Sequence, residues 1–522
     1  MPHTAPCLSQ DHLLLTCADM ARADAWAVSH GVPGVALMAT AGKVVCDAIR
    51  ARWAPRPVLV LCGPGNNGGD GHVVARRLHE AGWPVRLASS VPVAALQGDA
   101  AHHASRAGEI LAIEPLSDAL LDGAHLVVDA LFGAGLTRLF DGPAAMLLRQ
   151  ARSAGLPIVA IDVPSGLHGD TGADWGATPA DLTVTFFRKK PGHVLMPGRA
   201  LCGEICVRDI GIAPEALATA ARQTWENAPV LWCDQWAHPS APAVRPGMVA
   251  SGAIHKYVRG HTLVLGGAVM TGAARLSARA AARAGAGLTT LLVPRQVWPV
   301  YAGGLLCGMV QPLDDEDADA VAAAWSRQLG AMKWHSLVMG PGAALGLPGD
   351  DAAATLRTLV VDALLLADGR GVVLDADALT AFEREPEALF RALAGPAVLT
   401  PHEGEFRRLF GAGSGEDKLS ATREAARRSG AVVLHKGPDT VIADPEGRVV
   451  VNTNGPASLA TAGSGDVLSG LIAGLMAQGL PAFEAACAGA WLHGEAARAF
   501  GPGLLADDLP EQLPAVLRRL WG

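Results

Sequence analysis

A small-residue turn in the C-terminal half of the chain carries the clearest chemical signal. Gly463-Ser464-Gly465 leads directly into Asp466, which opens an apolar helical segment over 466–477. Successive backbone N–H groups in such a turn, together with the helix dipole, can stabilise charge that grows on a transferring phosphoryl group. A carboxylate beside them can accept the proton of an attacking hydroxyl. The turn predicts phosphoryl transfer with Asp466 as catalytic base; the alternative is a helix cap with glycines chosen for packing.

Polar or flexible residues follow three further predicted strands in the same half. His402, Lys436 and the turn Gly340-Pro341-Gly342 each come directly after a short apolar run. In open parallel sheets, ligands bind at the carboxyl ends of strands, where Lys436 would meet a nucleotide phosphate as a point charge. A lone histidine more often makes structural hydrogen bonds, but the strand-end position of His402, between a proline and two glutamates, favours a role in the site.

The N-terminal half has its own glycine-rich stretch, over 63–71, which follows the predicted strand 58–62 and precedes a helix. Glycines there would let backbone N–H groups approach an anion closely, so the stretch is a candidate cradle for a dinucleotide phosphate. Its spacing matches neither the Rossmann GxGxxG pattern nor the P-loop. A tight structural turn is the alternative interpretation.

Two strand-end aspartates accompany this stretch. Asp129 is followed by the flexible loop 133–138, and Asp162 is followed by Val163-Pro164-Ser165-Gly166. A single strand-end aspartate is more often a cap than a catalyst. Because the carboxyl ends of parallel strands share one edge of the sheet, however, both aspartates and both glycine-rich segments are expected to line one ligand site.

These residues need two α/β scaffolds to position them. The first half alternates apolar runs at 58–62, 126–129, 158–162 and 182–186 with helical patterns at 73–81 and 144–154, which predicts a doubly wound, Rossmann-like three-layer α/β domain. A second α/β series has strands at 262–265, 288–293, 337–339, 372–375, 398–400 and 432–434 and helices at 466–477 and 482–499. The expected boundaries are 1–220 and 251–522, with a Pro-, Ala- and Trp-rich linker at 221–250.

The bulk composition fits a small-molecule enzyme. Half of the 522 residues are hydrophobic and the formal charge is only −8, so nucleic acid is not expected as a partner. The nine cysteines form no CxxC pair, which argues against a disulfide framework or a zinc site. No apolar stretch is long enough to cross a bilayer, and the N-terminus has no signal-peptide pattern. A cytoplasmic homo-oligomer is the expected state.

The N-terminal motifs resemble a known family. Cys62-Gly-Pro-Gly-Asn-Asn-Gly-Gly-Asp70, Val128-Asp129-Ala-Leu-Phe-Gly133 and Ile161-Asp162-Val-Pro-Ser-Gly166 are similar to those of the NAD(P)H-hydrate epimerase family, which includes the apolipoprotein A-I binding protein. The resemblance implies an acid/base role for Asp162. It implies that Asn67, Asp129 and Ser165 bind K⁺, a hard cation suited to oxygen ligands. It also implies that the hydrate contacts Asp162 and Asn66, Asn67, Gly68, Gly69, Asp70, Gly133, Ala134, Gly135, Leu136, Thr137, Arg138 and Leu139.

The C-terminal motifs resemble the ADP-dependent NAD(P)H-hydrate dehydratase family, whose fold is the ribokinase-like α/β fold. The similarity extends from about residue 251 to the end and includes His255-Lys256, Thr271-Gly272-Ala273 and Leu374-Asp375-Ala376-Asp377-Ala378-Leu379. It implies two sets of contacts: Ala273, Gly342, His402 and Asp466 face the hydrate, and Lys436, Gly437, Pro438, Asp439, Thr440 and Gly465 face the adenine nucleotide.

In this order, the two domains resemble the bifunctional NAD(P)H-hydrate repair enzymes. The resemblance implies epimerisation of the R and S forms of NADHX and NADPHX, followed by dehydration of the S form to NAD(P)H, with ADP converted to AMP and phosphate and with Mg²⁺ on the nucleotide. One alternative is a small-molecule kinase, for example for a vitamin precursor, because kinases of this fold share the Gly-x-Gly-Asp turn. In that alternative the N-terminal half is a non-catalytic binding module.

Overall fold

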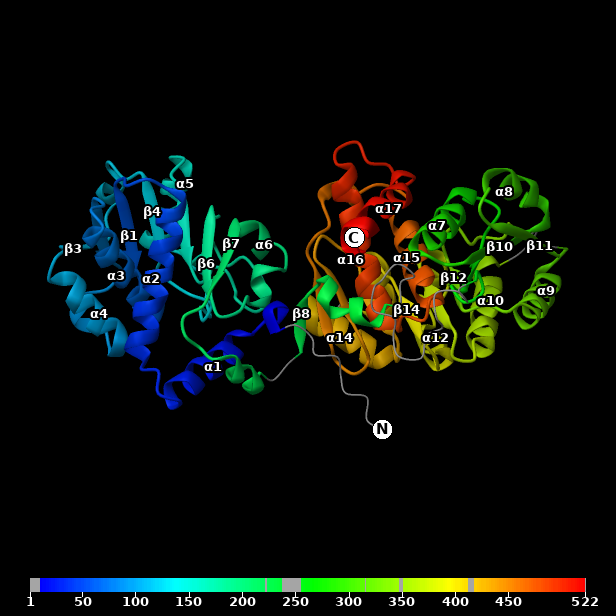
Figure 1. Ribbon diagram of the computed structural model, residues 1–522, viewed down its shortest axis with the longest axis horizontal. Helices are drawn as coiled ribbons and strands as arrows, with labels where there is room; N and C mark the ends of the chain where they lie inside the picture. The colour runs from blue at the N-terminus through cyan, green and yellow to red at the C-terminus, as the bar shows by residue number, and fades with distance from the viewer. Residues whose placement is uncertain are drawn as a thin grey trace. The chain divides into compact units, whose positions relative to one another are not determined.

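The computed structural model describes residues 10–220, 223–236, 255–314, 316–346, 351–411 and 417–521. They divide into two compact units, Gln10–Trp225 and the described part of Glu226–Gly522. Each unit is built on a sheet with helices, as Figure 1 shows. The α/β fold class predicted for both halves is confirmed.

The N-terminal unit contains, over its described residues, a seven-stranded sheet in the order β3-β2-β1-β4-β5-β6-β7. All neighbouring strands in it are parallel. The chain leaves β1 in one direction to form β2 and β3 and then returns to the other side of β1 to form β4, so the topological switch point lies between β1 and β4. The strands are β1 (Val58–Cys62), β2 (Val85–Ser89), β3 (Ile113–Pro115), β4 (Leu126–Ala130), β5 (Ile158–Ile161), β6 (Leu182–Phe186) and β7 (Glu204–Arg208).

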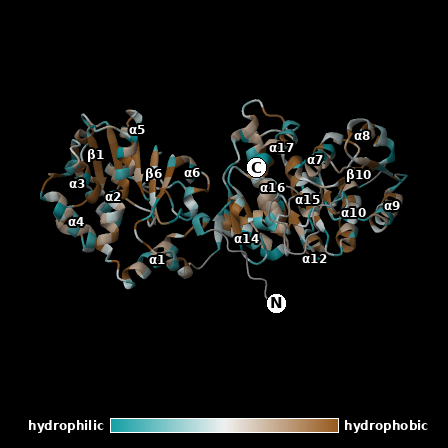
Figure 2. Ribbon diagram, in the orientation of Figure 1, coloured by the Kyte–Doolittle hydropathy of each residue, from teal (hydrophilic) through white to brown (hydrophobic). Residues whose placement is uncertain are grey.

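Hydrophobic side chains cover both faces of this sheet. Along β1, Val58, Val60 and Cys62 belong to one core cluster, and Leu59 and Leu61 belong to another, because successive side chains of a strand point to opposite faces. The first cluster includes residues of α1 (Cys17–Ser29), α2 (Gly34–Arg52) and α3 (Asn66–Glu80), and the second includes residues of α5 (Pro143–Ser153). Figure 2 shows the strands as mainly hydrophobic ribbons beside helices of mixed character. The unit therefore has three layers, as expected.

The glycine-rich stretch differs from the expected loop. Only Gly63, Pro64 and Gly65 lie outside regular structure, because α3 already begins at Asn66. A Cβ on Gly63 would overlap the carbonyl oxygen of Leu131, and one on Gly68 would overlap the carbonyl oxygen of Gly63. Two backbone segments thus approach each other more closely than any side chain allows. The glycines bring the start of the helix against the ends of β1 and β4, and this close packing explains a helix where local propensity predicts a loop.

The C-terminal unit has a ten-stranded mixed sheet over its described residues, in the order β11-β10-β9-β12-β13-β14-β15-β16-β17-β8. Neighbouring strands are parallel from β11 to β15, and β16 and β17 pair antiparallel. The strands are β8 (Thr224–Glu226), β9 (His261–Leu265), β10 (Leu288–Pro294), β11 (Met309–Leu313), β12 (Ser336–Met339), β13 (Gly371–Leu374), β14 (Ala397–Leu399), β15 (Val432–His435), β16 (Thr440–Ala443) and β17 (Val449–Asn452).

A pair of closely packed helices, α7 (Thr271–Ala284) and α15 (Ser464–Ala477), lies at the centre of this unit. A Cβ on Gly470 of α15 would overlap the carbonyl oxygen of Ser277 of α7. The other helices are α8 (Trp298–Gly304), α9 (Ala318–Ala331), α10 (Ala352–Leu366), α11 (Ala376–Thr380), α12 (Pro386–Ala392), α13 (Glu403–Phe410), α14 (Lys418–Ser429), α16 (Ala482–Phe500) and α17 (Asp508–Trp521). No helix among the described residues is long and apolar enough to cross a membrane.

The segment 221–250, expected to be a linker, contains ordered elements where it is described. Asn227 donates its backbone N–H to the carbonyl of Val451 (2.8 Å), and its side-chain oxygen accepts a hydrogen bond from the indole of Trp232 (3.2 Å). Trp232 and Trp236 are buried. The first part of the segment therefore packs onto the second unit, because its tryptophans have apolar surface to bury. Residues 237–250 lie outside the described residues.

The close contact between α7 and α15 predicts that one methyl group added at Gly470 strongly lowers the stability of the unit. Gly470→Ala should lower the free energy of unfolding by about 1–3 kcal/mol, since the added carbon meets backbone rather than a mobile side chain. Gly330→Ala in α9 is the matched control. Nothing lies within 4 Å of its Cβ position, so this change should stabilise the helix by up to about 1 kcal/mol. Urea unfolding of both variants measures the difference, and equal midpoints would contradict the proposed packing.

Candidate active sites

A cavity of about 700 Å³ opens at the carboxyl edge of the N-terminal sheet. Pro64 to Asn67 line it after β1, and Leu131 to Arg138 line it after β4, on the two sides of the switch point. Helices α1 and α2 supply the opposite wall. The side chains used below are among its lining residues: Met20, Leu37, Met38, Asn67, Asp70, Asp162 and Lys190.

Asp162 lies at the centre of a hydrogen-bond network in this cavity. Its Oδ1 accepts hydrogen bonds from the ammonium of Lys190 and from Thr185 Oγ1 (3.0 Å), and its Oδ2 accepts one from the backbone N–H of Ala134 (3.2 Å). Its backbone has φ = 69°, a left-handed conformation that is uncommon outside glycine. His193 Nε2 lies 2.8 Å from its carbonyl oxygen. The carboxylate is therefore tightly oriented.

The pKa values of two carboxyl groups in the cavity, those of Asp162 and Asp70, are shifted in opposite directions. Burial raises the pKa of Asp162, but the Lys190 ammonium and the hydrogen bonds more than offset this, so its pKa lies below the usual value. Burial, reinforced by the charges of Asp162 and Asp24, holds the pKa of Asp70 well above the usual range. Of these two groups, Asp162 therefore loses its proton more readily and Asp70 holds its proton more readily. Such a difference is typical of an acid/base pair.

The three residues expected to bind K⁺ are placed as follows. Ser165 Oγ donates to Asp129 Oδ1 (2.6 Å), and the Ser165 backbone N–H donates to Asp129 Oδ2 (2.8 Å). Asn67 is buried beside Gly133, and its Nδ2 has no hydrogen-bond partner. Burial raises the pKa of Asp129, although the hydrogen bonds from Ser165 and Leu131 oppose the shift. Over the described ranges, no three His, Cys, Asp or Glu side chains form a group that could hold a metal ion.

Most of the residues expected to contact the hydrate in this unit line the cavity. Asn66, Asn67, Asp70 and the segment from Gly133 to Arg138 do so. Gly68 and Gly69 do not, because they are buried in the first turns of α3, where they allow close packing. Leu139 also lies outside the lining and is 69 % exposed.

In the C-terminal unit, Asp466 lies in the first turn of α15. Gly463, with φ = 88°, is the N-cap, and the backbone carbonyl of Asp466 accepts a hydrogen bond from Ser277 Oγ (2.8 Å). Burial and the nearby carboxylates of Asp375 and Asp377 raise the pKa of Asp466 to about 6, although Lys436 opposes them. A carboxylate with this pKa is a competent proton acceptor at neutral pH.

Lys436 lies beside this turn and forms an ion pair with Asp375. Its Nζ is 2.7 Å from Asp375 Oδ1, and Ser469 Oγ of α15 donates to Asp375 Oδ2 (2.6 Å). Burial lowers the pKa of Lys436, but the carboxylates around it, Asp375 first, raise it above the usual value. A Cβ on Gly465 would lie only 3.4 Å from the lysine Nζ. Lys436 therefore keeps its positive charge next to the N–H groups of the turn.

The other residues expected at this site have mainly structural contacts in the described state. Gly342 lies beside Ala273, with 3.2 Å between its Cβ position and the alanine Cβ. His402 is the N-cap of α13, and its Nδ1 accepts hydrogen bonds from the backbone N–H groups of Gly404 (2.9 Å) and Glu405 (3.3 Å). These contacts place the ring proton on Nε2, and the side chain is half exposed. His402 Nε2 lies 3.4 Å from Glu405 Oε1, so both ring nitrogens have a partner on α13.

The loop expected to hold the nucleotide is closed by its own hydrogen bonds. Thr440 Oγ1 donates to the carbonyl of Gly437 (2.9 Å), and Lys418 Nζ of α14 lies 2.7 Å from Asp439 Oδ1. Pro438 lies between Gly437 and Asp439 in the sequence. The ammonium group of Lys418, on α14, therefore lies beside this loop in addition to that of Lys436. Lys418 is not among the residues predicted from the sequence.

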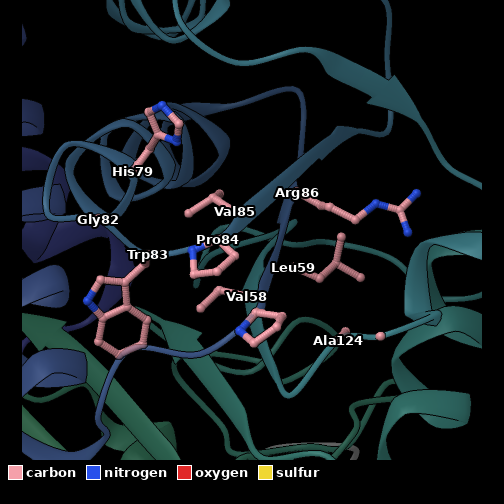
Figure 3. Close-up of a pocket in the computed structure, with 11 residues that line it drawn as sticks. Val58, Leu59, His79, Gly82, Trp83, Pro84, Val85, Arg86 and Ala124 are labelled. Carbon is pink, nitrogen blue, oxygen red and sulfur yellow. The ribbon is translucent and has the colours of Figure 1, made fainter.

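A second cavity, of about 580 Å³, lies at the opposite edge of the N-terminal sheet (Figure 3). Val58 and Val85, the first residues of β1 and β2, line it together with Trp83. Its arginine, Arg86, is paired with Glu114 (2.9 Å). None of the expected site residues lines this cavity.

Two family models match the chain. The model described as NAD(P)H-hydrate dehydratase matches residues 262–515, and the model described as YjeF-related protein N-terminus matches residues 34–192. A bifunctional NAD(P)H-hydrate repair enzyme of Moorella thermoacetica is 39% identical over 533 residues, with 97% of each chain covered. The chain belongs to the bifunctional NAD(P)H-hydrate repair enzyme family. The resemblance found in the motifs is thereby confirmed.

A further member of the repair enzyme family and a solved structure are also similar to the chain. The bifunctional repair enzyme of Salinibacter ruber is 37% identical over 549 residues, covering 98% of this chain and 97% of the relative. Among solved structures, the ADP/ATP-dependent NAD(P)H-hydrate dehydratase of Bacillus subtilis, co-crystallised with ATP and Mg²⁺, is 27% identical and covers 54% of this chain and 95% of its own, with a TM-score of 0.43.

Sequence analysis of this repair enzyme missed three charged residues in the sites. Lys190 and Asp375 complete the ion pairs described above, and Lys418 contacts the nucleotide loop. Lys190 had no local signal, since it follows Lys189 in a polar run after β6. Asp375 was recognised only as part of a motif. Their ion-pair partners are distant in the sequence, so only the fold brings the charges together.

The Asp162–Lys190 pair predicts a pH-dependent loss of stability. Lys190→Met leaves a buried, unpaired carboxylate, so the variant should be less stable by roughly 3–5 kcal/mol at neutral pH. Without the ammonium, burial raises the pKa of Asp162 above its unfolded value. The penalty should therefore shrink as the pH is lowered and the carboxyl group takes up a proton.

Urea unfolding between pH 5 and pH 8 measures this effect. Lys43→Met is the control, because Lys43 pairs with Asp47 (2.7 Å) on an exposed helical surface and should contribute no more than about 0.5 kcal/mol. A pH-independent penalty for Lys190→Met would show that lost packing, not charge, explains the effect.

Proposed function

We propose that the chain carries out both steps of NAD(P)H-hydrate repair with the two sites described above. The N-terminal unit interconverts the R and S forms of NADHX and NADPHX, and the C-terminal unit returns the S form to NADH or NADPH. Membership of the repair enzyme family supports both activities. The observation that carries the assignment of residues is Asp466, a carboxylate with a pKa of about 6, on a glycine turn beside Lys436.

In the N-terminal unit, the proposed reaction inverts the carbon that bears the added hydroxyl group and is bonded to the ring nitrogen. Asp70 donates a proton to the hydroxyl, the C–O bond breaks, and water leaves as the nitrogen lone pair forms a C=N bond. Water then adds to the other face, and Asp162 takes its extra proton. Both carboxyl groups regain their starting protonation states by exchange with solvent. The opposite pKa shifts of Asp70 and Asp162 support these roles.

Asn67, Asp129 and Ser165 would hold K⁺ in this unit. The chemistry of the donors fits, because amide, carboxylate and hydroxyl oxygens are hard ligands. The unpaired Asn67 Nδ2 is a donor and gives no support for a cation, whereas Asp129 is a buried carboxylate whose hydrogen bonds, among the described residues, come from Ser165 and Leu131. A bound cation would supply the positive charge that Asp129 otherwise lacks and would fix the loops after β4 and β5.

In the C-terminal unit, the proposed role of phosphorylation is to make a better leaving group. Asp466 takes the proton of the hydrate hydroxyl, whose oxygen attacks the terminal phosphoryl group of ADP, and AMP is released. The phosphorylated hydrate then loses phosphate and a proton from the neighbouring carbon, which restores the ring double bond. Lys436 and the N–H groups around Gly465 stabilise charge on the phosphoryl oxygens. Mg²⁺ on the nucleotide would neutralise further phosphate charge.

The remaining residues of the C-terminal site are assigned by proximity. Ala273 and Gly342 form a small-residue surface for the ring, and the exposed His402 ring would contact the hydrate through Nε2, which in the free protein lies 3.4 Å from Glu405 Oε1. The loop from Gly437 to Thr440 would face the adenine nucleotide. Phosphate groups there would meet the two ammonium groups of Lys436 and Lys418.

Removal of one carboxylate in each unit should separate the two activities. Asp466→Asn should abolish ADP-dependent recovery of reduced-nicotinamide absorbance and leave epimerisation intact, since Asn cannot accept the proton. Asp162→Asn should limit recovery from a mixed-epimer hydrate to the S fraction. Chromatography of both epimers with absorbance at the reduced-nicotinamide band measures both results.

Three outcomes would count against the proposal. Normal recovery by Asp466→Asn would overturn the catalytic role of this residue, and wild-type epimerisation by Asp162→Asn would return the N-terminal unit to a binding module. Accumulation of a stable phosphorylated product, with ATP preferred over ADP, would indicate a small-molecule kinase instead.

The pKa of Asp466 also predicts the pH dependence of dehydration. The base must be ionised, so kcat should fall as the pH is lowered through about 6. The epimerase step serves as an internal comparison, because Lys190 keeps Asp162 ionised to lower pH. Parallel acid limbs for the two reactions, measured on the same sample, would contradict this assignment.

A further inference from the structure

Asp375 lies where three segments of the C-terminal site meet. It follows β13 directly, and its side chain is almost completely buried. Oδ1 accepts hydrogen bonds from Lys436 Nζ (2.7 Å), at the end of β15, and from the backbone N–H of Ala376 (2.9 Å). Oδ2 accepts one from Ser469 Oγ of α15 (2.6 Å). One carboxylate thus joins two strand ends and the helix that begins with the Gly463–Asp466 turn.

The backbone around Asp375 is also closely constrained. A Cβ on Gly340 would overlap the Asp375 carbonyl oxygen, and the next residue, Ala376, has φ = 43°. A left-handed conformation at a residue with a Cβ costs free energy and persists only where the surroundings enforce it. The hydrogen bond from Ala376 N–H to Asp375 contributes to that enforcement. The side chain of Asp375 is therefore held in one place, with both of its oxygens occupied.

The ion pair lies directly beside the turn. No side chain separates them, because the Cβ position of Gly465 is 3.4 Å from Lys436 Nζ and 3.8 Å from Asp375 Oδ2. The charged and titratable groups that face Asp466 and Lys436 are Asp375, Asp377, Glu405 and His493. Burial lowers the pKa of His493 to about 4, so His493 is neutral at neutral pH.

We propose that Asp375 is a positioning residue of the dehydratase site, which holds Lys436 and the first turn of α15 in register so that nucleotide phosphate and Asp466 meet the hydrate together. The proposal rests on the function proposed above. Asp375 acts through Lys436 and Ser469, since both of its buried oxygens accept hydrogen bonds from these residues. Its negative charge has a second effect, because it is one of the groups that raise the pKa of Asp466.

Asp375→Asn tests this role in the full-length protein. Without the Asp375 carboxylate, the Lys436 ammonium should no longer be held in one position, which should raise the KM for ADP. Misalignment of the nucleotide phosphate with Asp466 should lower kcat by roughly 10- to 100-fold. Removal of a negative charge from the neighbourhood of Asp466 should also move the acid limb of the dehydratase pH profile down by about one pH unit. A residue that only stabilises the fold would lower the amount of active enzyme and leave the acid limb in place.

Ser469→Ala distinguishes the effect of the link between Asp375 and α15 from the effect of the negative charge of Asp375. This variant keeps the carboxylate but removes its link to α15, so kcat should fall while the acid limb stays near pH 6. Asp444→Asn and Ser429→Ala are matched controls: Asp444 is a buried carboxylate paired with Arg448, and Ser429 is a buried helical serine bonded to the Ala425 carbonyl (2.8 Å). Neither control should change the KM for ADP or the acid limb.

The two proposals fail in different ways. If Asp466→Asn is inactive while Asp375→Asn keeps the wild-type KM and acid limb, the positioning role is wrong and the proposed function stands. If Asp466→Asn retains dehydration, the proposed function itself fails. Urea unfolding of each variant reports whether the C-terminal unit has folded. An unfolded Asp375→Asn leaves Ser469→Ala to decide: unchanged kcat in that variant overturns the proposal.

Discussion

Each unit depends on one buried lysine–aspartate ion pair at the carboxyl edge of its sheet. Lys190 pairs with Asp162 in the first unit, and Lys436 pairs with Asp375 in the second. Transfer of either charge alone from water into such a site would be costly, so each member depends on the other and on added hydrogen bonds. Thr185 and the Ala134 N–H provide these bonds in one unit, whereas Ser469 and the Ala376 N–H do so in the other. The surrounding glycines then let backbone approach the pair.

The two ion pairs differ in which carboxyl group the lysine contacts. In the first unit the lysine contacts the proposed base itself, which lowers the pKa of Asp162 despite burial. In the second, the lysine pairs with the neighbouring Asp375, and the proposed base Asp466 has a pKa of about 6. The result is a carboxylate that stays ionised in one site and a base that can give up and take back a proton near neutral pH in the other. Both ammonium groups lower the pKa of the carboxyl group beside them, but burial and the carboxylates of Asp375 and Asp377 outweigh this effect at Asp466.

Sequence analysis identified the strands that carry site residues because each is a short apolar run that ends in a polar or glycine residue, as at Asp129, Asp162, His402 and Lys436. It misjudged the stretch 66–71, since glycines read locally predict a loop, whereas tertiary packing makes this stretch helical. It missed the ion pairs for a different reason: Lys190 is 28 residues from Asp162, and Lys436 is 61 residues from Asp375. No local sequence pattern encodes contacts between residues so far apart in the chain, and the pKa shifts depend on these contacts together with burial.

The glycine contacts at Gly63 and Gly68 have a consequence for how substrate preference could change. Gly63 and Gly68 do not line the N-terminal cavity, but a Cβ on either would overlap a backbone carbonyl oxygen, so these two contacts fix the backbone after β1 against the backbone after β4, next to the cavity. The opposite wall, from α1 and α2, presents ordinary side chains such as Met20, Leu37 and Met38. Selection or design that redirects this unit to another dinucleotide derivative could therefore act on the side chains of the two helices without disturbing the backbone contacts at Gly63 and Gly68.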